Sequence, residues 1–434
     1  MKQGITRGAA RLRQDPRNLF YLLSAAGILL YMLLSFRYGG ALYAWLAQEN
    51  APYIRFVDYF SHMELVADPA TLYQHVSWDA DGSYAAVFPP LAYCMYLALY
   101  RMTAPLGGLP AGKTPEEVPG ALSVLTVYLI FNAVFFYLAI ARTGERSRRR
   151  DLAIFTLLML SAVFLGSGLM LANSTVLVAA LLLLALTLKD DPRPAAREGG
   201  LLLLAVCVAM KLYPAVFGLV FLKEKKYRQL ARLILYSAVL FFVPFVFFGG
   251  RAGLAAWFRN LTGPLQSADF YGRPQFLQGV FCTLARTLTG QDLPGLCKGL
   301  TWVVSLLWVL LAWRSRSPIR TVFFLICVMV FFPANAYRYT LAYFAIPLVM
   351  MLKQPTREQG RGWTVGITSA LYGLLFTIPT WWLLVFPMEK RFSVHTLTSV
   401  EIWVYLAAWA LVAAETVAEL TERRAGKGRK LSRG

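Results

Sequence analysis

Carboxylate side chains are scarce in this chain of 434 residues, which has 23 Asp and Glu against 43 Lys and Arg. Long stretches carry no charge at all, and 58% of the residues are hydrophobic. A soluble globular domain carries charges over its whole surface, so the composition excludes that class. Apolar stretches of about 20 residues predict membrane-spanning helices instead, because their backbone groups bond within the segment.

Nucleotide-binding and metal-binding motifs are also lacking. The sequence has neither a P-loop nor a Gly-rich dinucleotide turn, so no nucleotide-handling domain is expected. The five cysteines show no Cys-x-x-Cys spacing, which argues against a redox or zinc centre. We expect no cofactor, although no motif bears on a divalent metal. Cys282 and Cys297 flank a polar segment, and the sequence leaves open whether they form a disulfide.

The basic residues are confined to short segments between apolar runs. Because this is the positive-inside pattern, it predicts a multi-pass protein of the plasma membrane with both termini in the cytoplasm. No groove-like pattern of aromatic and basic residues points to nucleic acid, whereas contact with membrane lipid headgroups is expected. Thirty of the 43 Lys and Arg residues lie in seven stretches: the N-terminus, 141–150, 189–197, 223–232, 314–320, 353–361 and 423–433.

The apolar runs predict an all-α polytopic membrane protein with about 10–13 transmembrane or re-entrant helices. The first run, 19–36, is expected to be a retained anchor, since no small-residue cleavage site follows it. Residues 1–420 then form one transmembrane domain, and residues 421–434 form a basic cytoplasmic tail. The polar segment 37–83 becomes a large first extracytoplasmic loop, and 250–275 a second polar loop.

Two apolar runs, 84–103 and 200–222, conflict with simple crossings. If both crossed the bilayer fully, basic clusters would fall on the outer side, which the positive-inside rule disfavours. Prolines in "FPPL" (88–91) and "KLYP" (211–214) would interrupt helices there. We therefore expect these two runs to be broken or re-entrant, lining a cavity or buried in protein.

The scarce carboxylates are concentrated in the first polar loop. Asp58 and His62 are spaced i and i+4, so they would share a face of a helix. A carboxylate at the edge of a hydrophobic cavity can serve as a proton acceptor. Asp68 precedes Pro69 and also fits a helix cap, and a solvated loop remains the alternative for the whole cluster. The acidic residues between 49 and 81 are Glu49, Asp58, Glu64, Asp68, Asp79 and Asp81.

Three cations are candidates for binding an anionic substrate. Lys211 interrupts an apolar run, where a lysine is either functional or extends to the interface, and both alternatives stay open. Arg338 follows Tyr337 at the edge of a predicted helix, and Arg273 lies in the second polar loop. An arginine that pairs with phosphate oxygens would hold a lipid phosphate and stabilise it as a leaving group.

Four segments together resemble the polyprenyl-phosphate-sugar-dependent membrane glycosyltransferases of the GT-C fold, and glycosyltransferase family 87 most closely. That family carries an Asp-aromatic pair after its first helix, an aromatic-Pro-Pro-Leu segment, an Asn-containing turn before a Leu-rich helix, and a Lys-x-Tyr-Pro stretch. The corresponding segments here are "VDYF" (57–60), "FPPL" (88–91), "ANSTVLVAALLLLAL" (172–186) and "MKLYPAVFGLVFLKEKKYR" (210–228).

The resemblance implies a GT-C-like helical bundle and an inverting transfer of mannose or another hexose. The donor would be a polyprenyl-phosphate sugar and the acceptor an extracytoplasmic glycan or glycolipid. Asp58 matches the family's catalytic base. Tyr337 and Arg338 stand where the family often has a histidine at the start of a late helix.

Two other classes of membrane protein share some of these features. Broken helices and a lysine at membrane depth fit a transporter or a flippase for lipid-linked glycans, but the sequence shows no internal repeat. A glycan polymerase or ligase also has many helices, although its dominant polar loop is expected late in the chain. The largest polar loop here comes first, which favours the transferase.

Overall fold

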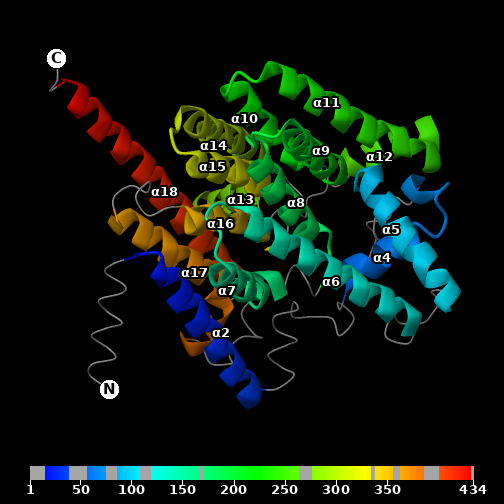
Figure 1. Ribbon diagram of the computed structural model, residues 1–434, viewed down its shortest axis with the longest axis horizontal. Coiled ribbons are helices and arrows are strands. Elements are labelled where there is room, and N and C mark those ends of the chain that lie inside the picture. The colour runs from blue at the N-terminus through cyan, green and yellow to red at the C-terminus, as the bar shows by residue number, and fades with distance from the viewer. Residues whose placement is uncertain are drawn as a thin grey trace.

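The computed structural model describes residues 15–38, 56–74, 86–107, 119–165, 171–262, 276–333, 338–354, 362–385 and 400–431. Within these ranges the chain is a bundle of helices without a strand (Figure 1). The first half contains α2 (Asn18–Tyr38), α4 (Val57–Leu65), η1 (Leu72–Gln74), α5 (Pro90–Thr103), η2 (Ala104–Leu106), α6 (Pro119–Arg142), α7 (Arg148–Met159), α8 (Thr175–Leu188), α9 (Pro194–Met210), η5 (Tyr213–Phe217) and α10 (Gly218–Lys223). The second half contains α11 (Tyr227–Phe242), η6 (Val243–Phe247), α12 (Gly250–Thr262), α13 (Leu277–Thr289), α14 (Pro294–Arg314), α15 (Pro318–Phe331), η9 (Arg338–Phe344), α16 (Ala345–Lys353), α17 (Gly362–Val385) and α18 (Val400–Leu431).

The predicted class, an all-α polytopic membrane protein, is confirmed. Four helices of the described part are long and apolar enough to cross a bilayer: Gly120–Arg142, Tyr227–Phe247, Pro294–Arg314 and Val404–Arg424. Six shorter apolar helices accompany them. Their outward faces carry exposed Leu, Val, Phe and Trp side chains, as on α11 and α14. Such faces are expected where hydrocarbon replaces water as the surrounding solvent.

Helix α8 lies in the centre of the bundle and forms much of its core. Its residues from Thr175 to Leu183 are all buried, as expected for a helix that is apolar on every side. It packs against α6 and α9. The turn that precedes it, residues 171–174, is therefore held rigidly at one end of the core.

Helix α17 lies between α2 and α18 (Figure 1). The contact with α2 is close, because a Cβ at Gly27 would lie 2.6 Å from the Cβ of Thr377. A residue without a side chain is needed where two helices approach to this distance. The first predicted span, 19–36, agrees with the bounds of α2 to within two residues at each end. It packs against α17, a segment from late in the sequence.

The two apolar runs expected to be irregular, 84–103 and 200–222, are both interrupted in the structure. Helix α9 ends at Met210, and Lys211 has extended backbone angles, φ −148° and ψ 113°. The chain then resumes as η5 and α10, with Pro214 near the η5 start. Helix α5 begins only at Pro90 and has 14 residues, so its length of about 21 Å is short of the ~30 Å hydrocarbon layer.

A second, tyrosine-rich core lies where α4, α5 and α12 meet, at the end of the view away from α18 (Figure 1). Helix α12 closes this end through two side chains. The indole Nε1 of Trp257 donates to Val87 O at 3.1 Å. The amide Nδ2 of Asn260 donates to Tyr73 O and Ala86 O, at 3.0 and 3.1 Å. These bonds hold the polar segments on either side of residues 75–85 against α12.

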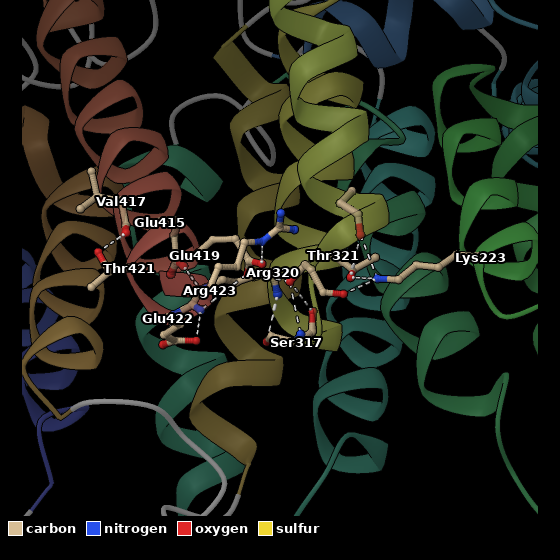
Figure 2. A network of polar contacts seen from close by, with 12 residues as sticks. Lys223, Ser317, Arg320, Thr321, Glu415, Val417, Glu419, Thr421, Glu422 and Arg423 are labelled. Atoms are coloured by element: carbon tan, nitrogen blue, oxygen red, sulfur yellow. Dashed lines mark hydrogen bonds and ion pairs between the residues drawn. The ribbon is translucent and has the colours of Figure 1, made fainter. Parts of the chain in front are cut away.

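An ion-pair network joins α15 to α18 (Figure 2). The guanidinium of Arg320 donates to Glu415 at 2.9 Å and to Glu422 at 2.6 and 3.0 Å. Glu419 accepts from Ser315 Oγ at 2.8 Å and from Arg423 Nε at 2.9 Å. Because Glu415 and Glu419 are buried, Arg320 provides charge compensation that the apolar surroundings do not.

Replacement of Arg320 by methionine should therefore weaken the α15–α18 contact. We expect a loss of about 1–2 kcal/mol, less than for a fully buried pair because Glu422 is partly exposed to solvent. Thermal unfolding of the detergent-purified variant, followed by tryptophan fluorescence, measures it. Arg316→Met is the matched control, since Arg316 is exposed in the connection between α14 and α15, four residues before Arg320. Equal unfolding midpoints for the two variants would show that the Arg320 ion pairs do not stabilise the α15–α18 contact.

Cys282 and Cys297 are free thiols in the structure, and both are buried. They lie on the adjacent helices α13 and α14, with the Cys297 side chain next to that of Cys282. The fold thus brings the two cysteines together across a tight helical hairpin without requiring a bond between them.

Candidate active site

The candidate site is built on α4, the nine-residue helix that carries Asp58. Its entry is fixed by Phe56, which adopts a left-handed conformation with φ 58°. The backbone N–H of Tyr59 donates to Leu171 O at 3.4 Å. This bond ties the first turn of α4 to the turn that precedes the central helix α8. Two segments separated by more than 100 residues thereby meet.

Asp58 is half-buried, and its two carboxylate oxygens have different surroundings. Oδ2 accepts a hydrogen bond from Asn173 Nδ2 at 2.6 Å. Oδ1 has no hydrogen-bond partner among the described residues. Burial raises the pKa of Asp58 above its ordinary value, while the Asn173 hydrogen bond and the charge of Lys211 act in the opposite direction. A carboxylate with one anchored oxygen and one available oxygen is suited to accept a proton.

Asn173 is itself held in one orientation. Its Oδ1 accepts from the Lys211 ammonium at 2.8 Å, from Thr175 N at 3.0 Å and from Thr175 Oγ1 at 2.7 Å. With three donors on the oxygen, the amide nitrogen must point toward Asp58. The backbone of Ala172, in a left-handed conformation with φ 51°, shapes the turn that presents this amide.

Lys211 is 3% exposed and projects from the break after α9 to the interior. Its Nζ lies 4.5 Å from the centroid of the Phe88 ring and 5.1 Å from that of Tyr339. Both rings contribute cation–π contacts that compensate part of the lost hydration. The ammonium is thus enclosed by one amide oxygen and two aromatic faces. The side chain is therefore buried in protein and does not extend to an interface, while a functional role for Lys211 stays a prediction.

His62 is buried on α4, one turn after Asp58, and packs among aromatic rings. Its ring centroid lies 4.4 Å from that of Phe88 and 4.9 Å from that of Tyr96. Burial, with a smaller contribution from the charge of Lys211, lowers the pKa of His62 to about 3. The imidazole is therefore neutral at physiological pH. Its position between Phe88 and the tyrosines makes it part of the wall of the site.

Asp68 lies apart from these residues, on the exposed end of the same segment. Its carboxylate accepts from Ala70 N at 3.2 Å and from Thr71 Oγ1 at 2.6 Å. The helix start expected at Pro69 is thus a capped turn, and the short helix η1 begins three residues later. The side-chain bonds to Ala70 and Thr71 hold the backbone in that turn.

The remaining candidates fall at the limits of the described chain. Arg273 and Tyr337 lie outside the described residues. Arg338 is the first residue of η9, the element whose Tyr339 faces Lys211. Among the described residues, no three His, Cys, Asp or Glu side chains converge as metal ligands. The residues that the structure brings together at the site are Asp58, Asn173 and Lys211, with the rings of Phe88 and Tyr339.

Sequence reasoning on single residues missed Asn173, Phe88 and Tyr339. Each stands in a segment singled out for its motif, but the motif did not identify the side chain that makes the contact. Of these three residues, only Asn173 could have been identified from the sequence. It stands shortly before an uninterrupted apolar helix, and a buried amide at such a position needs hydrogen-bond partners.

Comparisons with known proteins bear on the identity of this site. No curated protein matches the chain. Glycosyltransferase family 87 matches residues 85–337, more than half of the sequence. The matched region includes Phe88, Asn173 and Lys211, whereas Asp58 precedes it. Since the match spans the broken helices and the core that positions the site, the chain belongs to glycosyltransferase family 87.

Proposed function

We propose that this glycosyltransferase moves a hexose, mannose or a similar sugar, from a polyprenyl-phosphate carrier to a glycan or glycolipid on the outer side of the plasma membrane. The observation that carries the proposal is the Asp58 carboxylate, anchored through Oδ2 while Oδ1 has no partner among the described residues. The site lies in a membrane bundle, where a lipid-borne donor can reach it. The basic segments support cytoplasmic termini.

The proposed step is a single displacement with inversion. Oδ1 of Asp58 takes the proton of an acceptor hydroxyl while that oxygen attacks the anomeric carbon of the donor sugar. The bond from the anomeric carbon to the phosphate oxygen breaks, and its electron pair leaves with the polyprenyl phosphate. One base suffices for this geometry, unlike the paired carboxylates of hydrolytic enzymes.

Asn173 and Lys211 act as positioning residues in this scheme. Lys211 fixes the amide of Asn173, and the amide fixes Asp58 Oδ2. A base held in one geometry loses less entropy when the acceptor docks. His62 shapes the wall of the site, and Asp68 supports the loop that carries α4. The candidates for the donor phosphate are Arg338, Tyr337 and Arg273. Arg338 directly precedes Tyr339, whose ring contacts Lys211.

A donor screen tests the proposal. Purified protein in nanodiscs should transfer radiolabelled hexose from polyprenyl-phosphate donors and should show no transfer from nucleotide sugars. The product linkage, read by NMR, should have the opposite anomeric configuration to the donor. EDTA should leave the rate unchanged, since no metal participates in the proposed step.

The matched control is the Asp58→Asn variant in the same nanodiscs, which measures spontaneous hydrolysis of the donor. Transfer from a nucleotide sugar without a lipid carrier would contradict the donor assignment. Retention of the anomeric configuration would contradict the single displacement.

A further inference from the structure

Several buried hydroxyl groups next to Asp58 have no hydrogen-bond partner. Tyr59 on α4, Tyr96 on α5 and Tyr128 on α6 are each at most 3% exposed. Their hydroxyl oxygens make no hydrogen bond among the described residues. Leaving one such group unsatisfied destabilises the folded state. Native proteins seldom accept that cost, and a concentration of such groups in one place indicates something that bonds to them.

These three hydroxyls form one array with two further polar atoms. Tyr96 and Tyr128 interact electrostatically with each other and with Asp58. The rings of Tyr59 and Tyr128 have centroids 5.6 Å apart. Ser174 Oγ neighbours Tyr96, and Asn132 Oδ1 neighbours Tyr128, yet both atoms are also unpartnered. We call Tyr59, Tyr96, Tyr128, Asn132 and Ser174 the tyrosine array.

A neighbouring tyrosine shows that this core can satisfy a buried hydroxyl, although the hydroxyl of Tyr93 in the same core also has no partner among the described residues. Tyr73 belongs to the same aromatic core and is equally buried. Its hydroxyl donates to Phe88 O at 3.0 Å. The core can therefore satisfy a buried tyrosine by direct contact. In the array, by contrast, Ser174 lies beside Tyr96 and Asn132 beside Tyr128, yet none of these polar atoms has a hydrogen bond of good geometry.

Water suits these unpartnered atoms better than a sugar does. The unpartnered atoms are closed to bulk solvent, so a ring with several hydroxyls would have to force the helices apart to reach them. An internal water needs about three hydrogen bonds to buried polar groups. The array offers hydroxyls, which donate and accept, and an amide oxygen, which accepts.

We propose that the tyrosine array holds ordered water molecules against the carboxylate of Asp58. The functional consequence rests on the proposed role of Asp58 as the base. Water that donates a hydrogen bond to the carboxylate favours its charged form. The base is then ionised before each acceptor docks, although apolar side chains surround it.

Tyrosine-to-phenylalanine variants test the consequence. Tyr96→Phe and Tyr128→Phe remove the hydroxyls that order the water, so Asp58 should become harder to ionise. We expect the acid limb of the kcat/KM profile to move to higher pH by about half a unit to one unit, the equivalent of one lost hydrogen bond. Tyr73→Phe, the matched control, should leave the limb in place. A raised acceptor KM with an unmoved limb would overturn the proposal and assign the hydroxyls to the acceptor.

Radiolytic hydroxyl labelling tests the water itself, without any sugar transfer. In the wild-type protein in nanodiscs, bound water should make Tyr96 and Tyr128 react at least several-fold faster than Tyr73 despite equal burial. Equal labelling rates for the three tyrosines would overturn the water site. If labelling differs as expected while Asp58→Asn retains full activity, the water site stands and the role of Asp58 as the base falls.

Discussion

Asp58→Asn should lower kcat for hexose transfer by about 10²–10⁴-fold, the usual contribution of a general base. The substituted side chain has the same shape, and its amide oxygen can still accept from Asn173 Nδ2. Its amide nitrogen, however, stands where Oδ1 would take the proton, and a neutral amide is not a base. The thermal unfolding midpoint should therefore stay within a degree or so of wild type, because the anchoring bond is kept.

Glu64→Gln is the matched control for this experiment. Glu64 is an exposed carboxylate on the same helix α4, so the variant makes the same chemical change six residues away. Its kcat should equal that of wild type. If Asp58→Asn turns over normally while it is folded, another residue is the base. If both variants lose activity equally, the loss reports the charge of the loop and not the chemistry of Asp58.

The fold could be predicted from the sequence where local rules act alone. The apolar runs gave the helices, and Pro214 marked the break at "KLYP", because a proline cannot continue the backbone bonding of a helix. Asp68 before Pro69 also indicated a side-chain cap, but the capped segment is a turn and not the helix start expected at Pro69. Each of these features depends on residues within one or two turns of one another.

The contacts that define the site depend on distant segments and were not readable in this way. Asn173 lies 115 residues from Asp58 and 38 from Lys211. No periodicity in the sequence relates these positions, and only the packing of α8 and α9 brings them together. The same reason hid the Arg320–Glu415 pair, whose partners are 95 residues apart.

Lys211 illustrates how the structure places a side chain whose position the sequence leaves open. A lysine within an apolar run has the same sequence signature whether it extends to an interface or serves a buried site. The extended backbone at Lys211 turns its side chain to Asn173, Phe88 and Tyr339. Family membership then decides between the transporter and the glycosyltransferase in favour of the latter.

Substitution of Asn173 should separate the two functions of its amide. Asn173→Leu keeps the branched shape of the side chain but removes the donor to Asp58 and the acceptor for Lys211. We expect kcat to fall about 100-fold on the alkaline plateau, because a hydrogen bond to a charged group is worth roughly 1.5–3 kcal/mol. The acid limb should also move to higher pH, because the Asn173 hydrogen bond lowers the pKa of Asp58. Rate measurements across the pH range, with the unfolding midpoint as a stability control, give the result.

Asn173→Asp should behave differently, because it restores one of the two contacts. A carboxylate at this position still accepts from Lys211, but its second oxygen faces Oδ2 of Asp58 where Nδ2 now donates at 2.6 Å. Two carboxylates at this separation do not both ionise readily, so the pKa of the pair is split and one value is raised. The ionised base is then lost as pH falls through the raised pKa and regained as pH rises. At alkaline pH the activity of Asn173→Asp should accordingly approach that of wild type, whereas Asn173→Leu should keep its roughly 100-fold loss on the alkaline plateau. Equal plateaus for the two variants would show that the amide serves packing alone and does not position Asp58.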